Sequence, residues 1–316
     1  MNRLRIVFFG TAELACASLA ALAAQPDFEI VGVVTQPDRP RGRDLKLQPT
    51  PVKELALRHS LRVLQPERAR HESFVGTLAE LHPDLIAVAA YGQILPPAIL
   101  DLPRHGCLNV HASLLPKYRG AAPIQWAVLE DESETGVTIM KMDPGLDTGD
   151  ILTQETTAIA ATDNAQTLHD RLAEMGARLL ARTIPDYIAG RISPRPQPLE
   201  GASYARKIQK QDGSLDWRQP ARTLWNRGRA FTPWPGAFTC LHVGSTPRLL
   251  KIWQAEVAER FVGNPGEILQ ADKCGLVVGC GQQALRILSL QLEGGRRLHA
   301  QEFLAGHRLT IGEHLG

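Results

Sequence analysis

The residues best suited to chemistry in this chain are an asparagine and a histidine two positions apart, Asn109 and His111, within an apolar stretch. If residues 107–111 are extended, both side chains leave the same face of a strand. Asp147 lies in a glycine-flanked segment, 144–149, that can bring a carboxylate over the end of that strand. A hydrogen-bond donor, a proton carrier and a carboxylate would then share one site, which suits proton transfer.

Other kinds of site have less support around this trio. Ser113 follows the histidine by two residues but lacks the G-x-S-x-G pattern of a strained nucleophile turn, and Cys107 has neighbours typical of packing. Asn-x-His plus one distant Asp is a poor ligand set for zinc. The pattern therefore favours direct transfer, without a covalent enzyme intermediate and without a metal. The alternative interpretation is a core histidine satisfied by the backbone.

Alternating segments predict how these residues are positioned. Over the first 190 residues, short β-branched runs alternate with helical periodicity, which predicts βαβ units around a mainly parallel sheet. Ligands gather beyond the carboxyl ends of such strands, where we expect Asn109 and His111. The predicted strands are 5–9, 30–35, 85–90, 106–111 and 137–142. The predicted helices are 14–24, 51–59, 72–81 and 122–130, followed by a long helix capped by Thr162.

A proline-rich segment divides the chain. Residues 192–201 carry three prolines at alternate positions, which stiffen an extended linker. Short strands separated by Gly, Asn and Pro follow it and predict a small β-barrel or sandwich. These strands are 238–243, 249–255, 266–270, 275–280 and 284–290. The predicted boundaries are 1–189 for the first domain, 190–208 for the linker and 209–316 for the second domain.

Composition excludes several classes of protein. With 44% hydrophobic and 22% charged residues, the 316-residue chain has the composition of a soluble globular protein. No apolar run approaches the roughly 18 residues of a membrane span. The N-terminus shows no secretory cleavage pattern, so we expect a cytoplasmic protein without a membrane partner. The five cysteines form no CxxC pair, which favours ordinary thiols. Gly10 lacks the further glycines of a dinucleotide fingerprint and predicts a tight turn.

Positive charge is concentrated in two places. Residues 201–316 hold 15 Lys and Arg against 9 Asp and Glu, a net charge of +6, which leaves −4 for residues 1–200. The segment 36–46 adds Arg39, Arg41, Arg43 and Lys46. A second basic set, with Trp217, Trp225 and Trp234 between its members, comprises Arg206, Lys207, Lys210, Arg222, Arg227 and Arg229. Either a solvated surface or a polyanion partner explains this charge. The tryptophans are interpreted as core anchors.

Eight motifs along the chain carry a family resemblance. They are residues 36–43 (QPDRPRGR), 89–95 (AAYGQIL), 109–116 (NVHASLLP), 118–124 (YRGAAPI), 134–140 (ETGVTIM), 145–150 (GLDTGD), 233–237 (PWPGA) and 251–253 (KIW). Through them the chain resembles the methionyl-tRNA formyltransferases nearly end to end. The central motifs are shared with other enzymes that use 10-formyltetrahydrofolate as formyl donor.

The resemblance implies a fold and a reaction. The fold class is α/β, a Rossmann-like, mainly parallel sheet domain followed by a small OB-like β-barrel domain. The reaction passes the formyl group of 10-formyltetrahydrofolate, as co-substrate, to the α-amine of initiator methionyl-tRNA for translation initiation. Asn109 and His111 would stabilise the oxyanion that develops on direct attack by the amine, and Asp147 and His111 would relay the proton. No metal and a monomer are expected.

The resemblance also implies ligand contacts. Folate contacts are assigned to Ser113, Leu114, Leu115, Pro116, Tyr91, Gly92, Ile94 and Leu95. The tRNA contacts are assigned to Arg39, Arg41, Arg43, Lys46, Lys207 and Lys210. The chain departs from the family pattern at Ala12, Asp44, Gln211 and Thr232. The departure at Ala12 is expected to affect stability, and that at Asp44 the binding of phosphate. The departures at Gln211 and Thr232 are not expected to disable the enzyme.

Two other functions share parts of this pattern. Formyl transfer from the same donor to a sugar-nucleotide amine or to glycinamide ribonucleotide would use the same trio. The basic segment 36–46 and the charge of the C-terminal part suit a larger polyanion better. An RNA-binding protein that has lost activity is the non-enzymatic alternative, although such a relic would have no chemical need for all three side chains.

Overall fold

The chain forms two compact units. The computed structural model describes residues 3–41, 46–243 and 246–316. Unit 1 comprises the chain through Pro123 together with Glu134–Ala158 and His169–Ala205, and unit 2 comprises Ile124–Ser133, Ile159–Leu168 and Arg206–Gly316. Two ten-residue segments that precede the proline-rich linker therefore pack with the C-terminal part. The predicted domain boundaries stay a prediction.

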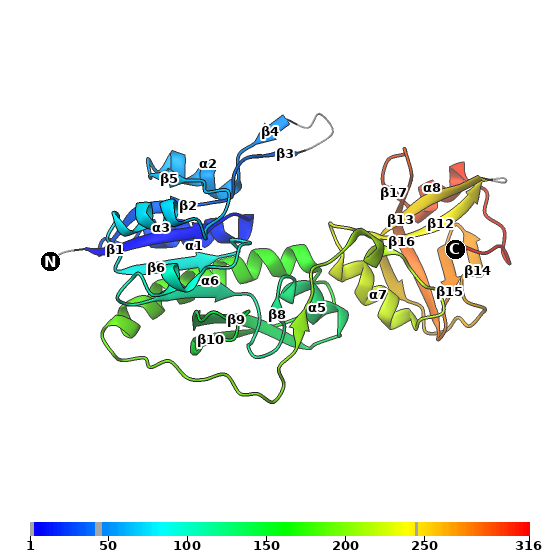
Figure 1. Ribbon diagram of the computed structural model, residues 1–316. Helices are drawn as coiled ribbons and strands as arrows, with labels where there is room; N and C mark the ends of the chain where they lie inside the picture. The colour runs from blue at the N-terminus through cyan, green and yellow to red at the C-terminus, as the bar shows by residue number, and fades with distance from the viewer. Residues whose placement is uncertain (1–2, 42–45, 244–245) are drawn as a thin grey trace. The chain divides into compact units, whose positions relative to one another are not determined.

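Unit 1 is organised around a seven-stranded sheet in the order β10-β9-β7-β6-β1-β2-β5 (Figure 1). Its strands are β1 (Leu4–Gly10), β2 (Phe28–Val34), β5 (Val63–Leu64), β6 (Leu85–Ala89), β7 (Cys107–His111), β9 (Glu134–Lys141) and β10 (Ile151–Ala158). The strands from β7 to β5 in this order are parallel, whereas β9 pairs antiparallel with both of its neighbours, β7 and β10. The mainly parallel sheet that the sequence predicts is confirmed.

Helices cover both faces of this sheet. Val7 and Phe9 of β1 pack with Phe74 in one core cluster, and strand alternation sends Ile6 and Phe8 to the opposite face. Apolar residues therefore fill β1 continuously, as expected of a strand buried on both sides. The helices of unit 1 are α1 (Glu13–Ala23), α2 (Pro51–Arg58), α3 (Glu72–Ala79), α4 (Pro97–Leu100) and most of α6 (Ala165–Ile188), whereas α5 (Pro123–Leu129) belongs to unit 2 from Ile124 onward.

Asn164 caps the long helix α6. Its Oδ1 accepts hydrogen bonds from the backbone amides of Gln166 and Thr167, at 2.9 and 3.1 Å. An amide oxygen in this position satisfies donors that have no partner within the helix. The predicted cap, Thr162, is therefore wrong by two residues.

Two short strand pairs complete unit 1. In the basic segment, β3 (Arg39–Arg41) and β4 (Lys46–Gln48) form an antiparallel pair. The second pair joins β8 (Arg119–Gly120) to β11 (Tyr204–Ala205), which lies at the end of the linker. The linker is thus attached to unit 1 by backbone pairing.

Unit 2 is β-rich. Its sheet has the order β12-β13-β16-β15-β14, and β17 pairs with β16. The strands are β12 (Ala237–Val243), β13 (Thr246–Val257), β14 (Ile268–Asp272), β15 (Gly275–Gly279), β16 (Ala284–Leu292) and β17 (Leu298–His299). Trp217, Leu250 and Phe303 belong to its core. With this unit the predicted fold class, a Rossmann-like domain followed by a small OB-like barrel domain, is confirmed.

Unit 2 also contains helical elements that lie outside the predicted segments. They are the 3-10 helix η1 (Lys210–Gly213) and the helices α7 (Ala221–Ala230) and α8 (Ala300–Gly306). The sequence of α7 is mostly polar and basic, so few apolar residues mark it as a helix. Within the described ranges, no helix is both long and apolar enough to cross a membrane.

Candidate active site

Strand β7 carries two of the three predicted site residues to the carboxyl edge of the sheet. Cys107, at its start, is buried, and its thiol donates to the carbonyl of Ile99 in α4 at 3.6 Å. Burial raises the pKa of this thiol to about 12, which suits a packing role. Asn109 and His111 follow at alternate positions and share its face of the strand.

The structure brings Asn109, His111 and Asp147 together. The His111 Nδ1 atom lies 3.7 Å from Asp147 Oδ2, and Asn109 Nδ2 lies 3.5 Å from Asp147 Oδ1. The histidine is 5% exposed, and the exposed fraction of the aspartate side chain is 14%. Each oxygen of one carboxylate therefore faces one of these two side-chain nitrogens in a site largely screened from water.

A backbone carbonyl fixes the orientation of the imidazole. His111 Nε2 lies 2.9 Å from the carbonyl oxygen of Tyr118. Because a carbonyl only accepts hydrogen bonds, Nε2 must carry a hydrogen there. The other ring nitrogen, Nδ1, faces Asp147. Any proton that this histidine exchanges with a substrate therefore passes through Nδ1.

The loop that presents Asp147 is tightly constrained. The backbone of this residue is left-handed, with φ of 51°, and its Oδ2 accepts a hydrogen bond from the Gly120 amide at 2.9 Å. A Cβ atom at Gly149 would lie 1.9 Å from the carbonyl oxygen of Lys141. Non-glycine residues hold such a backbone only where their surroundings impose it. The glycine that flanks this aspartate is thus needed for close approach.

Side chains of β9 and β10 donate hydrogen bonds to one segment assigned to folate, Ser113–Pro116. Thr138 Oγ1 donates to the Ser113 carbonyl at 2.7 Å, and Gln154 Nε2 donates to the Leu115 carbonyl at 2.9 Å. Ser113 and Leu115 are buried, whereas Leu114 and Pro116 are partly exposed. A ligand at this segment would therefore meet backbone groups and the latter two side chains.

The second assigned segment follows β6, which neighbours β7, so it reaches the same edge of the sheet. Tyr91 and Leu95 belong to the core, and burial raises the pKa of the tyrosine hydroxyl to about 12. The Ile94 side chain is 80% exposed. Gly92 has φ of 86° and almost open space beside its Cα atom. Anchored residues on both sides thus leave the centre of the loop free for contact.

The residues assigned to tRNA lie in both units. Arg39 pairs with Glu67 at 3.3 Å, and Lys46 is exposed on β4. Nothing is described of the Arg41 side chain, and Arg43 lies outside the described residues. Lys207 and Lys210 are exposed in unit 2. Within the described part of the chain, no ion pair involves these three lysines, so their charges face solvent.

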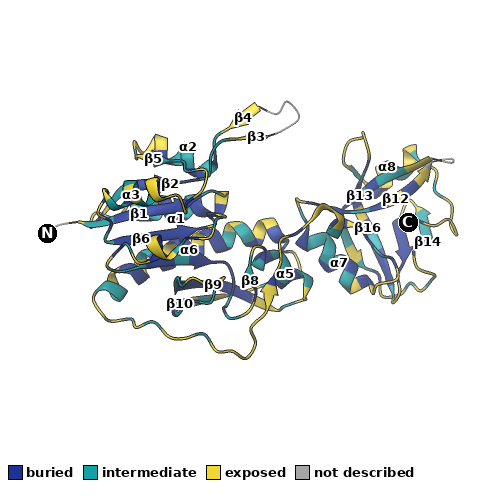
Figure 2. Cartoon of the chain, in the orientation of Figure 1, coloured by how far each residue is buried: buried dark blue, intermediate teal, exposed yellow. Residues whose placement is uncertain are grey.

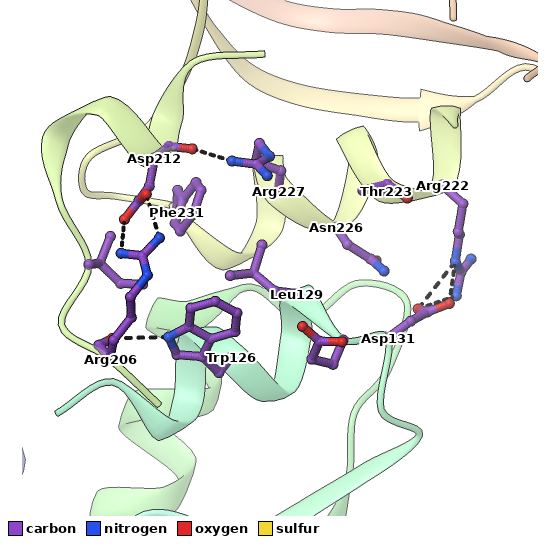
Figure 3. Close-up of a pocket in the computed structure, with 12 residues that line it drawn as sticks. Trp126, Leu129, Asp131, Arg206, Asp212, Arg222, Thr223, Asn226, Arg227 and Phe231 are labelled. Atoms are coloured by element: carbon purple, nitrogen blue, oxygen red, sulfur yellow. Dashed lines mark hydrogen bonds and ion pairs between the residues drawn. The ribbon is translucent and has the colours of Figure 1, made fainter. Parts of the chain in front are cut away.

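The arginines of the second basic set are paired differently (Figure 3). Arg206 binds Asp212 and Arg222 binds Asp131, with shortest N–O distances of 2.7 and 2.8 Å. These hydrogen bonds hold the pKa of both carboxyls below its ordinary value. The pairs border a cavity of roughly 370 Å³ between α5 and α7, within unit 2. These arginines therefore have carboxylates as partners already, unlike the exposed lysines.

The three tryptophans of this set differ in burial. Trp217 is a core residue, as the sequence predicts, and its Nε1 donates to Thr239 at 3.0 Å. Trp225 lies under the guanidinium groups of Arg222 and Arg229, whose centres are 4.4 and 4.0 Å from its ring centroid. Trp234 is 57% exposed, so its interpretation as a core anchor is wrong.

Sequence reasoning misses several polar residues that shape the site. Thr138 and Gln154 support the Ser113–Pro116 segment, and Gln197 of the linker donates to the backbone of the Asp147 loop. These residues lie 25 to 50 positions from the backbone groups that they bind, so no local spacing reveals them. All five cysteines are free. Among the described residues, no group of three or more His, Cys, Asp or Glu is arranged to hold a metal ion.

Comparison with known protein families gives matches over most of the chain. Residues 4–184 match the formyl transferase family, and residues 207–308 match the formyl transferase C-terminal domain. The methionyl-tRNA formyltransferase of Geobacter metallireducens is 48% identical over 316 residues, which is 100% of both chains. That of Caldanaerobacter subterraneus subsp. tengcongensis is 50% identical over 312 residues, covering 98% of this chain and 99% of the relative.

Solved structures with the same fold are more distant in sequence. The sugar 3N-formyl transferase WlaRD, crystallised with dTDP and 5-N-formyl-THF, is 19% identical with a TM-score of 0.66, over 94% of this chain and 100% of that one. HypX from Aquifex aeolicus in complex with tetrahydrofolic acid is 18% identical with a TM-score of 0.61. The match covers 99% of this chain and 51% of HypX. At these identities the likeness concerns the fold.

Proposed function

The chain belongs to the methionyl-tRNA formyltransferases, and on that premise we propose that Asn109, His111 and Asp147 are its catalytic residues. The enzyme formylates the α-amine of initiator methionyl-tRNA for translation initiation, with a folate-derived formyl donor. The observation that carries the assignment of residues is the convergence of Asn109 Nδ2 and His111 Nδ1 on one anchored carboxylate.

The geometry supports a division of roles within the trio. When the amine attacks the formyl carbon, negative charge develops on the formyl oxygen. Asn109 Nδ2 and a protonated His111 Nδ1 are the donors that would face this oxygen. Asp147 holds the imidazole and takes the proton that the amine loses, directly or through a water molecule. When the tetrahedral intermediate collapses, the bond between the formyl carbon and the donor nitrogen breaks, and that nitrogen takes up the proton as tetrahydrofolate leaves. The link of Asp147 to the Gly120 amide keeps the carboxylate in place during the transfer.

The proposed donor is 10-formyltetrahydrofolate, which supplies the formyl carbon when bound. The two segments assigned to folate fit such a molecule because they offer both apolar surface and backbone groups at one edge. Ile94 provides an exposed apolar side chain beside the open backbone of Gly92. Ser113–Pro116 continues directly from His111, so a donor held there lies next to the trio. No metal takes part in this proposal.

A transfer assay tests the proposed acceptor and donor together. The enzyme is given 10-formyltetrahydrofolate with aminoacylated initiator methionine tRNA, and in parallel with elongator methionine tRNA and an amino sugar nucleotide. We expect rapid formylation of the initiator tRNA and little of the other two acceptors. Formylation of the sugar nucleotide with an inert initiator tRNA would contradict the proposal. Binding of tRNA without consumption of the donor would favour an inactive RNA-binding protein.

Exposed lysines in both units are proposed to contact tRNA phosphates. The Lys46→Ala and Lys210→Ala variants should each lower the slope of log Kobs against log salt concentration by about 0.7 to 0.9, because one phosphate contact is lost. The slope is measured by titrating tRNA at several salt concentrations. Lys273→Ala, which removes the same charge from the exposed β14–β15 turn, is the matched control. Slopes equal to the parent's in both variants would remove these contacts from the proposal.

The proposal also covers the location and the assembly state of the enzyme. We propose that the enzyme acts in the cytoplasm, where translation is initiated, and as a monomer. Sedimentation of the purified enzyme with and without tRNA measures the assembly state. A stable dimer in the absence of tRNA would contradict the second part.

A further inference from the structure

One side chain of the linker, that of Gln197, hydrogen-bonds both to the loop that carries Asp147 and to Arg119. Gln197 lies among the alternating prolines, in a stretch that is mostly exposed (Figure 2), yet it is itself partly buried. Its Nε2 donates to the carbonyls of Asp147 and Gly149, at 2.8 and 2.7 Å. Its Oε1 accepts from Arg119 Nε and Nη2, at 3.1 and 2.8 Å. One amide thus makes four hydrogen bonds.

This pattern requires glutamine. The two carbonyls of the loop only accept hydrogen bonds, and the guanidinium of Arg119 only donates them. A planar group with two donor hydrogens on one end and an acceptor on the other satisfies both sides at once. Glutamate at position 197 would keep the contact with Arg119. Its second carboxylate oxygen, however, would lie against the two carbonyl oxygens of the loop and could not donate to them. Asparagine has the right groups but is one methylene shorter.

The same contacts close a ring around the carboxylate. Arg119 precedes Gly120, whose amide donates to Asp147 Oδ2. Gln197 therefore ties the backbone of Asp147 to the segment that holds its side chain. The linker continues to Ser203, whose Oγ accepts from the amide of Tyr118, the residue whose carbonyl binds His111. Linker residues thus act on both partners of the proposed proton relay.

We propose that Gln197 is a positioning residue for formyl transfer, which sets the place of the Asp147 carboxylate from the linker. The inference rests on the proposed function of Asp147. The loop needs such support because Asp147 has a left-handed backbone, with φ of 51°, in a turn that also includes Gly149. Without the two donors from Gln197, the loop can relax and carry the carboxylate away from His111.

Kinetics of Gln197→Ala and Gln197→Glu test the proposal. Both variants should lower kcat about tenfold to a hundredfold and leave KM for tRNA and donor within a factor of about two, because a displacement near 1 Å has effects of this size. Leu199→Ala, two residues along the linker and 91% exposed, is the matched control and should behave like the parent enzyme. A kcat equal to the parent's in both Gln197 variants would overturn the inference.

A double-mutant cycle separates positioning from general damage. In an Asp147→Asn background, Gln197→Ala should have almost no further effect on kcat, because its effect passes through that carboxylate. Full additivity would overturn the inference. Near-normal turnover of Asp147→Asn alone would instead contradict the proposed catalytic role of Asp147. Should the alanine variant fold poorly, hydrogen exchange of residues 145–150 in Gln197→Glu decides: faster exchange supports the proposal and unchanged exchange contradicts it.

Discussion

Replacing Asp147 with asparagine is expected to lower kcat for formyl transfer by about 10²- to 10⁴-fold, the usual range for loss of a general acid or base. The carboxylate faces the Gly120 amide, Asn109 Nδ2 and His111 Nδ1, all of which are donors when the imidazole is protonated. An asparagine has one acceptor oxygen and must turn an NH₂ group toward one of these donors. It also removes the negative charge that holds the protonated imidazole and accepts the proton.

Steady-state kinetics with both substrates measure this loss. KM for tRNA and for the donor should change little, because Asp147 acts on the reacting atoms rather than on binding. Asp170→Asn, which changes an exposed carboxylate on α6 in the same way, is the control for charge and folding. Turnover of Asp147→Asn within a few-fold of the parent, at unchanged thermal stability, would mean that this carboxylate has no chemical role.

The sequence predicts the core of this architecture because its signals are local. Strand β7 reads as a buried strand, and the period of two places Asn109 and His111 on one face. Each predicted strand of either unit lies within a few residues of an observed strand. Strand β10 escapes prediction because its burial alternates with exposed polar residues, which resemble a loop in composition. The two-residue strand β5 is too short to show any period.

Parts of the candidate site depend on contacts between distant segments. The approach of Asp147 to His111 spans 36 positions, and the sequence offers only the flanking glycines as a sign of it. The orientation of the imidazole depends on the Tyr118 carbonyl, a backbone group that every residue type would supply. Gln197 lies in a segment whose prolines indicate a simple spacer. Tertiary structure alone shows that this spacer binds the Asp147 loop.

Alanine at His111 or at Asn109 should each lower kcat about a hundredfold or more, because a preorganised donor to a developing oxyanion contributes about 3 to 4 kcal/mol. Both donors face the same carboxylate, at 3.7 and 3.5 Å, so both lie beside the place where the reacting groups must meet. His111→Ala should have the larger effect, since it removes the proton carrier as well as a donor. His169→Ala, on α6, is the control for loss of a histidine.

A double variant with alanine at both Asn109 and His111 shows whether the two side chains stabilise the same oxyanion or act in separate steps. If Asn109 and His111 stabilise one oxyanion, the double alanine variant should lose much less than the product of the single effects. The quantity measured is kcat/KM for methionyl-tRNA at saturating donor, with thermal stability of each variant as a check on folding. Strict multiplication of the two effects would assign the side chains to different steps. Near-parent turnover in either single variant would remove that residue from the trio.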